Sequence, residues 1–387
     1  MDQKKKTVGI FGTASFLNDM GSDMINPIWP LFVTEVLGAP MFILGLIDGI
    51  GEAIVSISKA VSGYVSDRIK KRKVFIWTGY LCGTLARVGY AISSIWQHII
   101  PFRILDRMGK MRSSPRDAIV SDISDKKDRG TNFAILEAMD NLGAVCGILF
   151  CIFLFQYLGY RNLFLIAAIP SVIAVLLIFF FIKREKKENG IKLYEGLKFK
   201  DLDANFGLFL VLSAIFELGA FTYSFLLIFA KEFGFKIAFV PILYLIFTAS
   251  AFLFAVPFGK LTDKIGRKKS LMLSFLMWGL VCLSFILFHS YWAIVGAFVI
   301  YGIHRGSIKP IQKTLVAEIT PARFTASTLG AFQMVLGLCA FPASFLAGIL
   351  WDKVGKSAPF YFALGMTVVA IILLMFVKET KEVEVKV

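Results

Sequence analysis

Residues Gly63–Lys73 read GYVSDRIKKRK, and residues Gly259–Lys269 read GKLTDKIGRKK. Glycine and aspartate keep the same spacing in the two stretches, and Asp67 and Asp263 are 196 residues apart. Self-similarity at a fixed offset across a chain indicates that one structural unit occurs twice. The repeat therefore predicts two similar halves.

A nearly equal offset occurs elsewhere in the chain. Two further pairs match at an offset of 194 residues: Arg129 with Arg323, and Gly143 with Gly337. The segment between the halves, KREKKENGIKLYEGLKFKDLDAN, is charged and poorly periodic, which is typical of a linker. We predict an N-terminal bundle over residues 1–182, a cytoplasmic linker over 183–204 and a C-terminal bundle over 205–387. Paired repeats of this kind favour a transporter with its cavity between two bundles.

The composition indicates an integral membrane protein. Hydrophobic residues make up 57% of the 387 residues and charged residues 18%, and the mean hydropathy is +0.72, which is too apolar for a soluble globule. The first apolar segment follows MDQKKK and carries Asn18, Asp19 and Asp23, so we expect it to remain as a span and not to be cleaved as a signal peptide. The five cysteines form no C-x-x-C pair, and we expect no disulfide, metal or cofactor.

Twelve apolar segments are long enough to cross a bilayer. They begin near residues 7, 41, 73, 96, 129, 160, 205, 237, 269, 291, 322 and 358. With both termini in the cytoplasm, the inner segments hold 27 Lys and Arg residues and the outer loops hold 5. This bias follows the positive-inside rule, and it explains the net charge of +15 without nucleic-acid binding.

The fourth segment is unusual, because Arg103–Asp117 (RILDRMGKMRSSPRD) places seven charged side chains in fifteen residues. It would otherwise be read as a cytoplasmic amphipathic loop. Removing this span would invert every later loop and turn the basic clusters at 183–200 and 260–269 outward, against the charge rule. We therefore predict a true fourth span.

Acids and bases nearly balance within the spans of the first half. The acids are Asp19, Asp23, Asp48, Glu52, Asp106, Asp117, Glu137 and Asp140, and the bases are Lys59, Arg87, Arg103, Arg107, Lys110, Arg112 and Arg116. We interpret span 4 as an interior helix whose cations are matched by acids on spans 1, 2 and 5. A purely structural role for these ion pairs is the alternative.

Ionisable groups inside spans often mark transport pathways. Asp19, Glu52 and Asp140 are the predicted proton carriers, because burial disfavours an ionised carboxyl group and a movable arginine favours it. Arg103 and Arg107 either pair with these acids or hold an anionic cargo. The remaining candidates for substrate binding or ion pairing are Asp106, Glu137, Asn141, Glu217, His304, Arg305 and Gln333.

The G-x-x-x-D-[RK]-x-x-[RK] pattern after spans 2 and 8 resembles the loop motif of the major facilitator superfamily (MFS). Span 1 (SFLNDMGSDMINPIWPLF) and span 4 (DRMGKMRSSPRDA) are also similar to a prokaryotic subgroup of that superfamily that reads D-R-x-G-K-G-x-R-x-x-P-R-D-A. Met111 replaces the second glycine of this pattern, and Lys70 replaces a glycine that the second half keeps as Gly266.

The resemblance implies an all-α membrane fold with twelve transmembrane helices in two pseudo-symmetric six-helix bundles. It also implies a cytoplasmic charge cluster that latches the outward-open state. The latch candidates are Gly63, Asp67, Arg68, Asp122, Arg129, Gly259, Asp263, Arg267, Glu318 and Arg323. On the same ground we expect the protein to lie in a prokaryotic cytoplasmic membrane and to move a small molecule outward. We also expect a monomer, and coupling to protons through the span acids named above.

Three functions are alternatives to proton-coupled export. Uptake or facilitated transport of an organic anion would use the span 4 cations as its binding charge. A non-transporting membrane sensor or assembly factor would need a partner protein. An enzyme is not expected, because the chain has no G-x-x-x-x-G-K-[ST], G-x-S-x-G or H-E-x-x-H motif.

Overall fold

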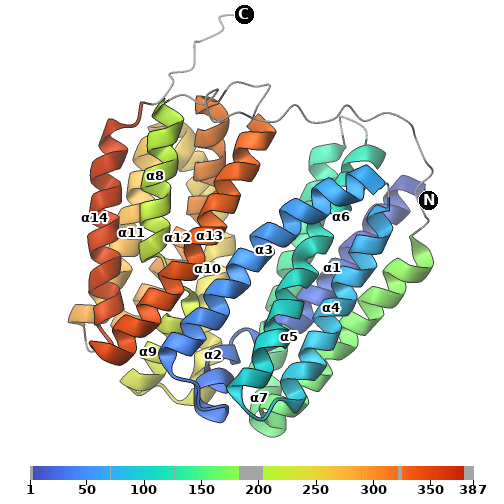
Figure 1. Ribbon diagram of the computed structural model, residues 1–387, viewed down its shortest axis with the longest axis horizontal. Helices are drawn as coiled ribbons and strands as arrows, with labels where there is room; N and C mark the ends of the chain where they lie inside the picture. The colour runs from blue at the N-terminus through green and yellow to red at the C-terminus, as the bar shows by residue number, and fades with distance from the viewer. Residues whose placement is uncertain are drawn as a thin grey trace, which may run out of the picture. The chain divides into compact units, whose positions relative to one another are not determined.

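The computed structural model describes residues 3–69, 71–124, 128–182, 204–288, 290–320 and 325–378. Every regular element in these ranges is a helix, which confirms the predicted all-α class (Figure 1). Residues 183–203 of the predicted linker lie outside the described residues.

The chain divides into two compact units. The first contains Met1–Ile191 and Thr222–Leu245, and the second contains Lys192–Phe221 and Ile246–Val387. Thr222–Leu245 therefore belongs to the second half of the sequence but to the first unit.

The helices of the first unit are α1 (Gln3–Ile25), α2 (Trp29–Leu31), the π-helix η1 (Phe32–Val36), α3 (Met41–Ile69), α4 (Arg72–Ile92), α5 (Trp96–Met108), the 3-10 helix η2 (Gly109–Arg112), α6 (Ser113–Ile123), α7 (Arg129–Phe181), α9 (Tyr223–Phe233) and η4 (Ile237–Phe239). Helix α10 (Val240–Ile265) begins in the first unit and continues in the second. The other helices of the second unit are α8 (Ala204–Gly219), α11 (Arg267–Leu287), α12 (Tyr291–Ile319), α13 (Thr325–Lys353) and α14 (Ala358–Phe376).

Each of the twelve predicted spans coincides with helical structure. Seven segments of the described chain are long and apolar enough to cross a membrane: Met41–Ser66, Thr131–Phe181, Ala204–Phe233, Ile237–Ile265, Arg267–Leu287, Thr328–Lys353 and Ala358–Phe376. Thr131–Phe181 contains two predicted spans. The other four predicted spans correspond to α1 to η1, α4, α5 to α6, and α12, and the number of spans is consistent with twelve.

Helix breaks occur where glycine permits them. Within α7, Gly159 has φ 66° and ψ −171°, so two helices meet at the predicted boundary between spans 5 and 6. Gly266, directly before α11, has φ 89°. Side chains with a Cβ rarely adopt these backbone conformations, which gives a physical reason for the glycine in the second copy of the loop motif.

Span 4 is helical throughout but changes its winding in the middle. The α-helices α5 and α6 are joined by the tighter turn η2, where Gly109 packs against Gly79 of α4. A Cβ added at Gly79 would overlap the carbonyl oxygen of Gly109. The close approach of α4 therefore requires small residues here, and it brings the basic side chains of span 4 into the interior of the first unit.

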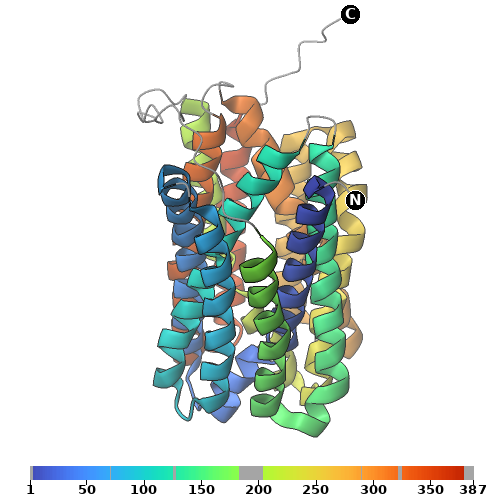
Figure 2. The same ribbon diagram turned by 90° about the vertical axis from the view of Figure 1, so that its right-hand side faces the viewer.

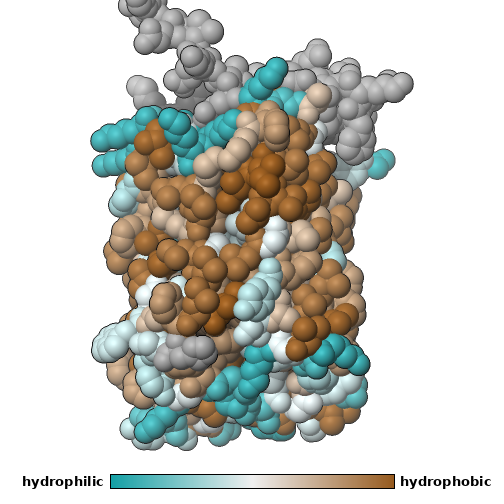
Figure 3. Space-filling model, turned by 90° about the vertical axis from the view of Figure 1, so that its left-hand side faces the viewer, coloured by the Kyte–Doolittle hydropathy of each residue, from teal (hydrophilic) through white to brown (hydrophobic). Residues whose placement is uncertain are grey.

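Helix α1 packs along α7, and Figure 2 shows the two side by side. One end of this contact has an apolar core that includes Phe11, Ala14 and Leu136. On the face drawn in Figure 3, apolar side chains cover the middle and polar ones gather above and below. Exposed apolar residues such as Leu276 on α11 and Phe376 on α14 are suited to contact with lipid.

Candidate functional site

The cations of α5 lie against carboxylates of α3. Arg103 Nη2 donates to Asp48 Oδ1 at 2.8 Å, and both side chains are buried, with exposures of 5% and 3%. One turn further along both helices, Arg107 Nη1 lies 3.8 Å from Glu52 Oε1. Residues four apart share a helix face, so two successive ion pairs, Arg103–Asp48 and Arg107–Glu52, connect α5 with α3.

Two further carboxylates approach span 4 from α1 and α7. Asp19 Oδ1 lies 3.4 Å from Arg112 Nη2 and 3.8 Å from Lys110 Nζ. Asp140 Oδ2 accepts from Arg116 Nη1 at 3.3 Å. The predicted proton carriers Asp19, Glu52 and Asp140 are therefore each next to a span 4 cation.

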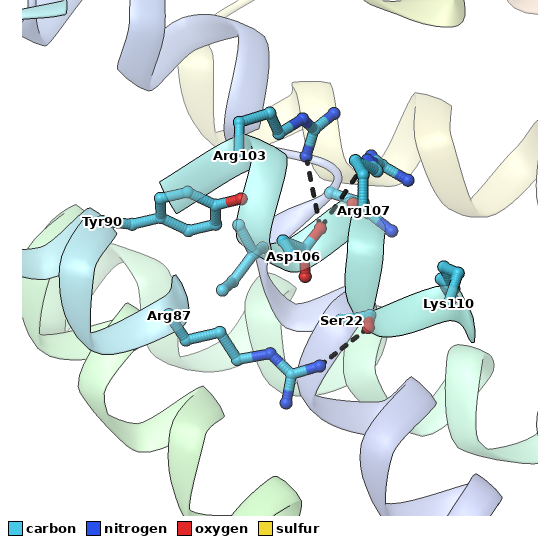
Figure 4. A pocket seen from close by; sticks show the side chains of 9 residues that line it. Ser22, Arg87, Tyr90, Arg103, Asp106, Arg107 and Lys110 are labelled. Carbon is cyan, nitrogen blue, oxygen red and sulfur yellow. Dashed lines mark hydrogen bonds and ion pairs between the residues drawn. The ribbon is translucent and has the colours of Figure 1, made fainter. Parts of the chain in front are cut away.

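Asp106 lies among several cations (Figure 4). Its Oδ2 is 3.9 Å from Arg103 Nη1 and 3.7 Å from Arg107 Nε, which are ion-pair distances longer than a normal hydrogen bond. Asp106 and the basic side chains of Arg87, Arg107 and Lys110 line the same cavity.

Asp48 accepts hydrogen bonds from several elements of the first unit. Its Oδ1 accepts from Trp29 Nε1 at 2.9 Å as well as from Arg103, and its Oδ2 accepts from Ser224 and, at 3.4 Å, from Thr222. The Arg103 guanidinium also lies 4.1 Å from the centre of the Trp29 ring, a cation–π contact. These contacts fix Arg103 between α2, α3 and α9.

Arg87 of α4 is buried among neutral acceptors. It donates to the Asn18 carbonyl at 2.9 Å, the Ala167 carbonyl at 3.1 Å and Ser22 Oγ at 2.8 Å. Among the residues that the structure describes, no carboxylate lies within ion-pair distance of it. Its charge therefore adds to the positive character of the interior.

These side chains surround a cavity of about 30 Å³ in the first unit. Its walls come from α1, α4, α5 and η2, and its charged lining comprises Arg87, Arg103, Arg107, Lys110 and Asp106. A cavity of this size holds water or one small polar group in this conformation.

Among the candidates in the second unit, His304 is buried and its hydrogen bonds are to neutral groups. Its Nδ1 lies 3.0 Å from Ser274 Oγ and 2.8 Å from the Ser274 carbonyl, and its ring stacks on Trp278 at 5.8 Å. Glu217 is half-buried, while Arg305 and Gln333 are exposed.

Glu137 and Asn141 are also outside the charged cluster. Glu137 is exposed, and Asn141 Nδ2 donates to the Glu137 carbonyl at 2.8 Å. In the described residues, no group of three or more His, Cys, Asp or Glu side chains is arranged to hold a metal ion.

The two copies of the loop motif lie beside similar charge clusters. In the second unit, Arg267 pairs with Glu318 at 3.0 Å and with Asp263 at 2.7 Å. In the first unit, Arg72 pairs with Asp122 in the way that Arg267 pairs with Glu318. Arg68 is exposed.

The remaining latch candidates are three charged residues and two glycines. The side chains of Asp67 and Arg129 and the whole of Arg323 lie outside the described residues. A Cβ at Gly63 would touch Ser114 at 3.4 Å, whereas one at Gly259 would meet no described atom within 4 Å. Close packing therefore accounts for the first of these two glycines and not for the second.

Sequence reasoning missed three contributors to these sites: Asp48, Trp29 and Arg72. Asp48 is visible in the sequence as an acid within a span, but its closeness to Arg103 depends on how α3 and α5 are aligned. Trp29 follows a proline-containing break that hides its place in span 1. Arg72 lies in a run of basic residues, and the sequence does not show which of them pairs with Asp122. In the structure it is the first residue of α4.

Comparison with known proteins matches both halves of the chain to one family model. The Major Facilitator Superfamily model matches residues 11–229 and again 207–386. An uncharacterised MFS-type transporter of Methanocaldococcus jannaschii is 36% identical over 381 residues, with 96% of this chain and 95% of the relative covered.

Two more distant proteins also resemble the chain. The multidrug resistance protein MdtG of Proteus mirabilis is 26% identical, with 82% of each chain covered. Among solved structures, a mutant of the nucleoside transporter NupG superposes with a TM-score of 0.79 at 16% identity, covering 95% of this chain and 99% of that one. The last similarity concerns the fold alone.

Proposed function

The chain belongs to the major facilitator superfamily, and we propose that it is a secondary active transporter that exports a small solute by alternating access, coupled to protons. The observation that carries this proposal is the set of span 4 cations in contact with Asp19, Glu52 and Asp140. In this proposal, the gradients of solute and protons drive transport, and the transport cycle contains no enzymatic reaction.

Proton coupling follows from the competition between burial and ion pairing. A buried carboxyl group binds a proton when its cationic partner moves away, and it releases the proton when the partner returns. Asp19 lies between Arg112 and Lys110, and Asp140 faces Arg116. Movement of α1 relative to η2, and of α7 relative to α6, would therefore change the protonation of Asp19 and Asp140 respectively.

The charge clusters beside the loop motifs support alternating access. We propose that the Arg72–Asp122 pair and the Arg267–Asp263–Glu318 group stabilise one conformation at the cytoplasmic side. The positive-inside bias supports cytoplasmic termini, and the subgroup resemblance of span 4 supports a prokaryotic cytoplasmic membrane. Export is favoured by the multidrug resistance relative, and we propose a monomer as the working unit.

The test is solute flux in proteoliposomes under an imposed pH gradient. Ethidium, tetracycline and citrate serve as probes, and a trapped pH-sensitive dye reports proton movement. The wild type is expected to couple the flux of at least one probe to proton movement. Asp19→Asn, Glu52→Gln and Asp140→Asn are each expected to reduce that coupling at least tenfold.

The matched control is Asp352→Asn, which removes an exposed carboxylate near the end of α13 and should leave coupling unchanged. If all three interior variants transport as the wild type does under a pH gradient, the coupling proposal is wrong.

A second candidate is uptake or facilitated transport of an organic anion. It is favoured by the cavity lining, in which four basic side chains and one carboxylate take part. Flux measured at two opposite pH gradients separates the candidates, because an uncoupled anion facilitator responds to the anion gradient and membrane potential and moves no protons.

A further inference from the structure

The lining of the cavity in the first unit holds more basic than acidic side chains. Arg87, Arg103, Arg107 and Lys110 contribute four cations to its walls, and Asp106 contributes one anion. Arg103, Arg107 and Lys110 also pair with Asp48, Glu52 and Asp19, which lie outside the lining, and Arg87 donates to neutral groups. Buried charge of one sign attracts a ligand of the other sign.

Two lining residues of this cavity, Arg103 and Arg107, each have a buried N–H group with no acceptor among the described residues. Arg103 Nε and Arg107 Nε are inaccessible to solvent and make no hydrogen bond with any described residue. Arg103 as a whole is only 4% exposed. Buried polar groups in native proteins are almost always hydrogen-bonded, so these two donors indicate a ligand with acceptor oxygens.

The nearby carboxylates do not fill this role. Asp48 is fully engaged by Arg103 Nη2, Trp29 and Ser224. Asp106 Oδ2 is 3.7 Å from Arg107 Nε, which is too far for a hydrogen bond. A carboxylate bound in the cavity would offer acceptor oxygens to the two guanidinium groups, once their side chains turn toward it.

We infer that this cavity binds the carboxylate head of a small organic anion through the guanidinium groups of Arg103 and Arg107. The planar, forked guanidinium matches a carboxylate better than an ammonium does. The cavity volume of about 30 Å³ admits a head group and not a whole organic molecule in this conformation. The inference rests on the proposed transport function and names its substrate class.

Asp48 acts in this scheme as a positioning residue. It holds Arg103 against the Trp29 ring at 4.1 Å and also accepts from Ser224 of α9. A bound carboxylate and Asp48 would compete for the same guanidinium. Removing the charge of Asp48 should therefore strengthen anion binding, which is the opposite of what a purely structural carboxylate would do.

The test uses the purified full-length protein in detergent, without a membrane gradient. Sodium succinate is titrated against its neutral diamide, succinamide, and against sodium chloride and sodium phosphate at matched ionic strength. Thermal unfolding gives the apparent Kd, since a ligand that binds only the folded state raises the Tm. Trp29 fluorescence gives a second readout, with Trp29→Phe identifying its contribution.

Succinate is expected to raise the Tm of the wild type, while succinamide, chloride and phosphate do not. Arg107→Gln should weaken succinate binding about 10- to 100-fold, because it removes charge-assisted hydrogen bonds. Asp48→Asn should bind succinate more tightly than the wild type. Arg161→Gln, which removes an exposed arginine that donates to the Ser93 carbonyl, is the matched control and should bind as the wild type does.

Equal shifts with succinamide, chloride or phosphate would overturn the assignment of a carboxylate site. So would unchanged succinate binding in Arg107→Gln, while weaker or equal binding in Asp48→Asn would overturn the competition with Asp48. If pH-coupled flux of another solute is seen and succinate does not bind, this inference alone fails. If succinate binds but no solute or proton flux occurs, the proposed transport function fails instead.

Discussion

Span 4 and span 10 occupy corresponding places in the two halves, yet their basic side chains have opposite surroundings. In span 4, Arg103 and Arg112 are 4% and 7% exposed. In span 10, which is the uninterrupted helix α12, Arg305, Lys309 and Lys313 are exposed. A repeated backbone therefore carries buried charge in one copy and not in the other.

The interior of the second unit is built from neutral contacts. His304 binds Ser274, and Phe216 stacks on Phe275 with ring centres 4.0 Å apart. Phe209 stacks on Phe332 at 5.4 Å. Burying charge has a large desolvation penalty, and none of the described Asp, Glu, Lys or Arg side chains of the second unit is fully buried. The charged cluster in the first unit therefore carries a desolvation cost for which the described interior of the second unit has no counterpart.

The ends of the helices differ much less between the copies. Arg72 and Arg267 each open a helix and pair with an acid near the end of span 4 or span 10. The next residues are also similar: Lys73 donates to the Phe179 carbonyl at 2.7 Å, and Lys268 donates to the Met375 carbonyl at 2.7 Å. The helix ends are therefore built alike in the two copies, while the helix centres differ.

The contrast between the units is tested most strongly at Arg103. Arg103→Met should destabilise the protein by about 3–5 kcal/mol, because it leaves Asp48 buried without its cation. His304→Phe should lower stability by only about 1 kcal/mol, since it removes a neutral hydrogen bond. Reversible unfolding in SDS measures both free energies.

Adding Asp48→Asn to Arg103→Met should recover part of the loss, because the uncompensated charge is then gone. A loss for Arg103→Met no larger than that for His304→Phe would contradict the claim that buried charge distinguishes the two units.

Glycine packing should affect the two units alike. Gly147 of α7 faces the backbone of Met20 in α1, and Gly306 of α12 faces the backbone of Ala251 in α10. Gly147→Leu and Gly306→Leu should each lower the free energy of unfolding by about 1–3 kcal/mol through overpacking. The same SDS unfolding measurement applies, with Gly207→Leu as control, because a Cβ at Gly207 meets nothing within 4 Å.

A large loss in one unit only would show that the shared backbone packs by different rules in its two copies. In that case the comparison would extend from the polar interiors to the apolar contacts between helices.

Much of the fold could be predicted from the sequence, because apolar length and charge bias act locally. The position of Gly159 divides spans 5 and 6 where the sequence indicated, and span 4 is helical despite its charges. Matching of the span 4 cations to acids on spans 1, 2 and 5 also followed from the near balance of charge inside those spans.

The individual partners could not be predicted, because they depend on helix rotation and on chain reversal. Asp48 and Glu52 are one turn apart, and only the structure pairs the first with Arg103 and the second with Arg107. Ser224 reaches Asp48 from a segment 176 residues away. Periodicity defines the face of a helix but does not specify which neighbour that face meets.

The smallest effect on stability is expected where the two units are most alike, at the charge pairs beside the loop motifs. Asp122 is 64% exposed and Glu318 is 27% exposed, and pairs with exposed partners contribute about 0–1 kcal/mol. Asp122→Asn and Glu318→Gln should therefore change the free energy of unfolding by no more than about 1 kcal/mol, and less at high salt. Their effect on conformational exchange should be larger and equal in the two variants, because each removes the same kind of contact from its own copy. Cysteine accessibility to a membrane-impermeant reagent, measured from each side in proteoliposomes, reports that exchange. A shift in accessibility for only one variant would mean that the matching ends have diverged in function as the centres have.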